Sequence, residues 1–171
     1  MSSLIEIIQD GIRYICNKTS AKFAYWVIPA IIAIILWYLN WIIPARTSSD
    51  IISGIGLFAG LMFTLLFVIT GNYKARKSEL KNSKNEEDVK YLQRYFAFAE
   101  QSISLISYSI VKAGAIIIIS IIYSLLDSET TSNIARIILS SLLFINWWQF
   151  VIILINILSE MYAMLYDDIN K

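Results

Sequence analysis

The stretch IISGIGLFAGLMFTLLFVIT, residues 51–70, carries no charged side chain and sets the architecture of the chain. A bilayer core about 30 Å thick is crossed by roughly 20 mostly apolar residues in a helix. A helix is required there, because every backbone N–H and C=O must find its partner within the span. Three further stretches meet the same test, at residues 23–43, 103–126 and 137–158. The sequence therefore predicts an all-α polytopic membrane protein with four transmembrane helices.

The composition supports this class and argues against several others. Of the 171 residues, 57% are hydrophobic and 16% are charged, whereas about a quarter of a soluble domain is charged. The net charge of +1 is too balanced to indicate direct nucleic-acid binding. Cys16 is the single cysteine and there is no histidine, so the commonest general base and transition-metal ligand is missing. We expect no catalytic residue, no cofactor and no metal site.

The basic residues that flank the spans predict the orientation. One side of the predicted bundle would carry Arg46 and Arg136 alone, whereas the other would carry most of the lysines and arginines. Under the positive-inside rule, the two termini and the long loop at 71–102 lie in the cytoplasm. We expect a multi-pass protein of the bacterial inner membrane.

The loop at 71–102 is the only sizeable region outside the predicted spans. Apolar residues recur from Leu92 into the third span at near-heptad spacing, which predicts one helix from Asp88 to Leu126. We therefore expect the second and third helices to extend into a cytosolic antiparallel hairpin, and residues 159–171 to form a cytosolic tail. The basic residues of the hairpin are the candidates for docking a cytosolic protein: Lys74, Arg76, Lys77, Lys81, Lys84, Lys90 and Arg94.

Residues 1–22 contain an amphipathic pattern. Leu4, Ile8, Ile12 and Ile15 recur at helical spacing, while Asp10 and the other charges fall elsewhere. The pattern fits a helix that lies in the cytoplasmic membrane interface. It equally fits a helix that packs on the inner surface of the protein.

Small residues recur with a spacing close to four along the second span, at Ser53, Gly56, Gly60 and Thr64. Such spacing allows two membrane helices to approach closely. The partner helix could belong to the same subunit or to another copy.

Polar residues form one stripe on each of the last two spans. The third span carries Ser109, Lys112, Ser120 and Tyr123, and the fourth carries Asn146, Gln149 and Asn156. Polar groups in hydrocarbon seek partners or water, so the stripes would either bond to each other inside the subunit or line a shared axis in an oligomer. Lys112 would lie only about 7 Å below the inner boundary, from where its side chain can snorkel to the headgroups. Trp147 and Trp148 lie near the middle of the fourth span, and their role stays open.

The run of residues 51–71, followed by NYKARK and by YLQRYFAFAEQSISLISYSI, resembles small four-span prokaryotic membrane proteins of antiphage systems. These include the membrane subunit KwaA of Kiwa defence, the Rex membrane protein of temperate phages and four-span accessories of some RNA-targeting CRISPR loci. The resemblance covers residues 50–158 and concerns topology rather than a specific motif. It implies a homo-oligomer, with a tetramer favoured, that acts with a cytosolic partner.

Two functions follow as hypotheses. The first is a non-enzymatic, homo-oligomeric inner-membrane sensor or effector subunit, surrounded by membrane lipids, whose inner hairpin docks a cytosolic protein. The second is a holin-like or passive pore, because a channel needs only a lined path.

Overall fold

The computed structural model describes residues 4–16, 19–82, 86–126 and 132–169. In these ranges the chain is all-α and contains five helices, with no strand. They are α1 (Leu4–Ile15), α2 (Thr19–Tyr38), α3 (Ala45–Asn82), α4 (Glu86–Leu126) and α5 (Asn133–Ile169). The all-α fold predicted from the sequence is confirmed, and α4 covers the helix expected from Asp88 to Leu126.

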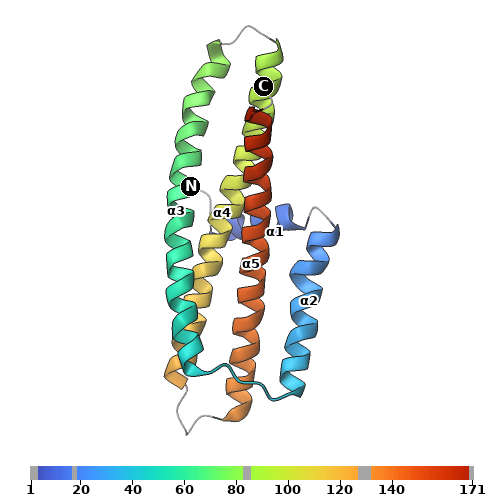
Figure 1. Cartoon of the computed structure of the whole chain (residues 1–171), viewed down its shortest axis with the longest axis vertical. Helices are drawn as coiled ribbons and strands as arrows, with labels where there is room; N and C mark the ends of the chain where they lie inside the picture. The colour runs from blue at the N-terminus through green and yellow to red at the C-terminus, as the bar shows by residue number, and fades with distance from the viewer. Residues whose placement is uncertain (1–3, 17–18, 83–85, 127–131, 170–171) are drawn as a thin grey trace.

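The three long helices form the body of the molecule. α4 packs against both α3 and α5, and α2 packs against the other side of α5. Figure 1 shows α3, α4 and α5 running nearly parallel to the long axis, with α2 beside only the lower part of the bundle. α1 lies across the long helices, at the level where α2 begins (Figure 1).

Three helices are long and apolar enough to cross a membrane: Arg46–Ser78, Val89–Leu126 and Asn133–Ala163. The chain is therefore a multi-pass helical membrane protein by the length and hydropathy of these helices. The apolar part of α2, Lys22–Tyr38, is a shorter helix.

The first predicted span, residues 23–43, extends too far at its carboxyl end, because α2 ends at Tyr38. The N–H of Trp41 donates to the carbonyl of Leu36, and the N–H of Asn40 donates to that of Trp37. Asn40 has a φ of 50°, so the pair forms a Schellman cap with asparagine in the left-handed position. Hydropathy alone misses this end, because the cap lies inside an apolar run.

The segment after this cap crosses from α2 to α3 and is held at both backbone groups of Ile43. The N–H of Ile43 donates to Ser140 Oγ at 3.2 Å, and its carbonyl accepts from the hydroxyl of Tyr123. Ser48 Oγ, in the first turn of α3, donates to the carbonyl of Ser120 at 3.3 Å. These bonds tie together the start of α3, the end of α4 and the start of α5, and Figure 1 shows the connection passing across α5.

α1 packs onto the bundle through its apolar face. Gly11 and Ile15 are buried, and Gly11 lies against the ring of Tyr108 on α4. The hydroxyls of Tyr108 and Tyr25 are 2.6 Å apart, so α1, α2 and α4 meet at one buried point. The structure thus shows α1 packed on the protein itself, and its location in the membrane interface stays a prediction.

α5 is longer than the predicted fourth span at both ends. It begins at Asn133, after Ser132, whose carbonyl accepts from the N–H of Arg136. It continues to Ile169, so most of the segment expected to form a cytosolic tail is an extension of the same helix. Figure 1 shows this extension running beside the α4 part of the hairpin.

Candidate functional site

Lys112 joins the two polar stripes. Its Nζ donates to Asn146 Oδ1 at 3.1 Å and to Gln149 Oε1 at 2.6 Å. The ammonium therefore bridges α4 and α5, whereas the snorkelling of Lys112 toward the headgroups stays a prediction. The stripes meet inside one chain at this point, as the first of the two interpretations expected.

The other stripe residues do not join this cluster. Ser109 Oγ donates to the carbonyl of Ile106 at 2.7 Å, and Asn156 Nδ2 donates to that of Ile152 at 2.8 Å. Tyr123 binds the α2–α3 connection instead. Ser120 Oγ is buried and has no hydrogen-bond partner within the described ranges. The stripes therefore do not act as one unit. Lys112 bridges α4 to α5, Tyr123 binds the α2–α3 connection, and Ser109 and Asn156 bond to their own helices.

Trp147 and Trp148 have different surroundings. The indole N–H of Trp148 donates to the carbonyl of Ala24 at 3.0 Å, which fastens α5 to α2. Trp147 lines an apolar pocket together with Trp41, Ile51 and Phe144. Trp148 is a contact between helices, and Trp147 covers the junction of α3 and α5.

The small residues of α3 do not pack against another helix of the chain. A Cβ built at Gly56 or Gly60 would meet nothing within 4 Å. Ser53 and Thr64 are exposed, and each donates to the carbonyl four residues earlier in its own helix. The interpretation that this face packs inside the subunit does not hold, whereas packing between copies stays a prediction.

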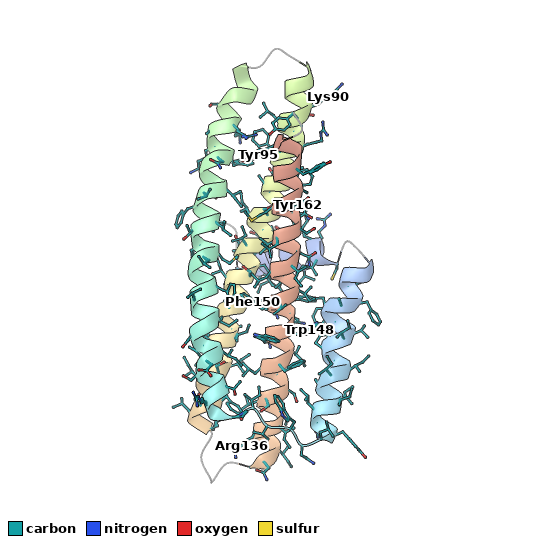
Figure 2. All side chains as sticks on the ribbon, in the orientation of Figure 1. Lys90, Tyr95, Arg136, Trp148, Phe150 and Tyr162 are labelled. Carbon is teal, nitrogen blue, oxygen red and sulfur yellow. The ribbon has the colours of Figure 1, made fainter. Side chains whose placement is uncertain are left out.

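Arg76 connects the two helices of the hairpin, α3 and α4. Its Nη1 donates to the hydroxyl of Tyr91 at 2.7 Å, and its guanidinium lies 4.2 Å from the centre of the Tyr95 ring. Nearer α1, the hydroxyl of Tyr73 donates to Glu100 Oε1 at 2.9 Å, and its ring contacts Phe96 edge to face. Figure 2 shows Tyr95 between the two helices of the hairpin. Arg76 was predicted as a docking residue, but in the structure it holds α3 against α4.

The remaining basic residues of the hairpin are distributed over its surface. Lys74, Lys77, Lys90 and Arg94 are exposed. Lys84 and the side chain of Lys81 lie outside the described residues. The candidate docking surface, which we call the hairpin cation surface, therefore consists of Lys74, Lys77, Lys90 and Arg94.

The carboxyl end of α5 lies beside this surface. Gln101 Nε2 on α4 donates to Glu160 Oε1 at 2.9 Å, which fixes the register of the two helices. Tyr162 and Tyr166 stack on each other with 70% and 59% of their surfaces exposed. Exposed tyrosine pairs are typical of protein-binding surfaces, because each ring offers a large rigid area with a polar edge.

Several of these positioning residues give a weak sequence signal. Gly11 is a glycine inside a helical pattern, where it costs about 1 kcal/mol relative to alanine unless packing requires it. Tyr25 and Tyr108 are far apart in the sequence, so no local pattern indicates that they are in contact. Arg76 has no distinguishing feature among the other basic residues of the hairpin.

The described ranges hold no group of three or more His, Cys, Asp or Glu residues able to bind a metal ion. Comparisons with protein families, with curated proteins and with solved structures found no match for this chain. The function is therefore argued from the geometry of the chain itself.

Proposed function

We propose that this protein is a non-enzymatic four-span inner-membrane subunit that presents a helical hairpin to a soluble partner in the cytosol. The observation that carries the proposal is the hairpin itself, which continues well beyond α1 and is held together by the Arg76 and Tyr73 contacts. The antiphage context of this activity rests on the resemblance in topology.

The level of the inner membrane surface follows from α1. α1 is amphipathic, lies across the bundle and packs against Tyr108, which is the arrangement of an interfacial helix (Figure 1). From Tyr108 to Leu126, α4 measures about 27 Å, and the apolar part of α2, Lys22–Tyr38, measures about 26 Å. Both lengths match the hydrocarbon core. This agreement supports α2 as the fourth span.

The hairpin cation surface lies too far from this level to bind headgroups. Counted along α4, Arg94 is about 21 Å and Lys90 about 27 Å beyond Tyr108. The Debye length at physiological ionic strength is about 8 Å, so a lipid surface attracts these charges little. They are placed to meet a soluble protein, as is the exposed pair Tyr162 and Tyr166 near the end of α5.

Self-association through α3 is part of the proposal. Within the described ranges, α3 packs closely against α4 and leaves Leu57, Leu61, Phe67 and the small residues exposed. A second copy can approach closely along Gly56 and Gly60, since small residues let helix backbones come together.

A pore receives less support. The charged member of the polar stripes, Lys112, bonds to α5 of its own chain, and Tyr123 bonds to the connection before α3. These side chains are already paired within one subunit, so they are poorly placed to line a shared axis.

Co-purification with the soluble proteins encoded beside this gene tests the proposal. Arg94→Glu should weaken retention of the partner about tenfold, as expected for a charge at an interface. Arg46→Glu is the same change at the start of α3, at the end of the bundle opposite the hairpin, and should leave retention of the partner unchanged. The particle mass from the same purification reports the number of copies. Equal retention by both variants, or no retained neighbour with the unmodified protein, would contradict the docking function.

A further inference from the structure

The Lys112 bridge lacks a counter-charge. Its two partners are the amide oxygens of Asn146 and Gln149, which carry no net charge. Within the described ranges, no carboxylate forms an ion pair with the ammonium. A charged side chain at membrane depth normally pairs with an opposite charge or reaches water. Lys112 therefore lacks a neutralising charge among its described partners.

Gln149 holds the ammonium in a buried position. The residue is 3% exposed, and its Oε1 accepts from Lys112. The ammonium has three N–H groups, and within the described ranges Asn146 and Gln149 accept from it. A third acceptor oxygen can therefore still bind to Lys112.

The bridge lies just below the inner membrane surface, at a depth from which a lysine side chain can reach the headgroup region. Lys112 is one helical turn below Tyr108, about 6 Å along α4 from the level of α1. Lys112 and Asn146 both keep part of their surfaces exposed, so the bridge is not sealed from the membrane. Lys22, exposed in the first turns of α2, lies one turn before Tyr25, which bonds to Tyr108.

We propose that Lys112, with Gln149, binds a phosphate group, and that the source of this phosphate is an anionic phospholipid of the inner leaflet. A phosphodiester supplies both the negative charge and several acceptor oxygens. A soluble phosphate ester has the same chemistry and is distinguished by experiment.

The test measures lipid binding to the delipidated full-length protein by native mass spectrometry and thermal stability in detergent. Phosphatidylglycerol should bind about tenfold more tightly than phosphatidylcholine, the size of effect expected for one charge-assisted hydrogen bond. Lys112→Met should remove this preference. Lys22→Met, the same change at the nearby rim of the bundle, should retain it.

Separate arms with inorganic phosphate and glycerol 3-phosphate distinguish the two sources. Neither should stabilise the protein at the concentrations at which phosphatidylglycerol does. Equal stabilisation by the free phosphates would overturn the assignment to lipid.

The proposal is also overturned if the unmodified protein shows no preference for phosphatidylglycerol, an outcome that needs no variant to fold. It fails equally if Lys112→Met folds and keeps the preference, or if only Lys22→Met loses it. None of these results depends on the cytosolic partner, so they leave the docking function unaffected.

Discussion

At the scale of single residues, the structure depends on a few close approaches between elements distant in sequence. Gly11 packs on Tyr108, whose hydroxyl bonds to that of Tyr25. Lys112 connects α4 to α5 in a similar way. Each contact joins side chains that no local pattern relates. Sequence analysis identified Lys112 as unusual from its depth, but its partners depend on how α4 and α5 pack.

The close approach of Gly11 to Tyr108 predicts that alanine at position 11 lowers the stability of the protein, whereas alanine at Gly71 does not. A Cβ at position 11 would fall 2.7 Å from Tyr108 Cδ1 and still closer to the base of the ring, which cannot swing away. Gly11→Ala should destabilise the protein by about 1–3 kcal/mol, as overpacking does in a core. The loss should appear as a lower unfolding midpoint in detergent, followed by tryptophan fluorescence.

Gly71→Ala is the matched control. A Cβ there meets nothing within 4 Å, and the residue lies inside α3. The substitution should raise stability by up to about 1 kcal/mol through helix propensity. Equal midpoints for the two variants would mean that α1 is not docked on α4.

At the scale of elements, hydropathy predicted where helices exist better than where they end. The run at 51–70 lies inside α3, and the heptad pattern from Leu92 lies inside α4. The end of α2 depends on the left-handed cap at Asn40 within an apolar stretch, which a hydropathy window cannot detect. The extension of α5 beyond residue 158 depends on packing against α4, for example between Gln101 and Glu160.

The hairpin predicts an element-scale effect of Arg76. Arg76→Gln removes the cation from the ring of Tyr95 and weakens the bond to Tyr91. Local opening of the hairpin should become about tenfold more frequent, since such contacts contribute about 1–2 kcal/mol together. Limited trypsin digestion of the protein in detergent should cut the hairpin correspondingly faster.

Lys74→Gln serves as the control for this digestion, because it also removes one trypsin site from an exposed position two residues away. Its cleavage rate at the other sites should equal that of the unmodified protein. If both variants are cut at the same rate, Arg76 does not hold the hairpin together.

At the scale of the whole molecule, the account places a bundle in lipid and a helical hairpin in the cytosol. Composition predicted the class of the protein, since it reflects the solvent around each segment, whereas the orientation that the charge distribution indicates stays a prediction. Neither could predict that α1 packs on Tyr108, the contact from which we infer the level of one membrane surface.

Cysteine labelling with a membrane-impermeant maleimide tests this placement most directly. In a Cys16→Ser background, Arg94→Cys places the label site on the hairpin, and Arg46→Cys places it at the start of α3. Intact spheroplasts should label Arg46→Cys at once and Arg94→Cys only after permeabilisation. Labelling of Arg94→Cys in intact spheroplasts would contradict a cytosolic hairpin.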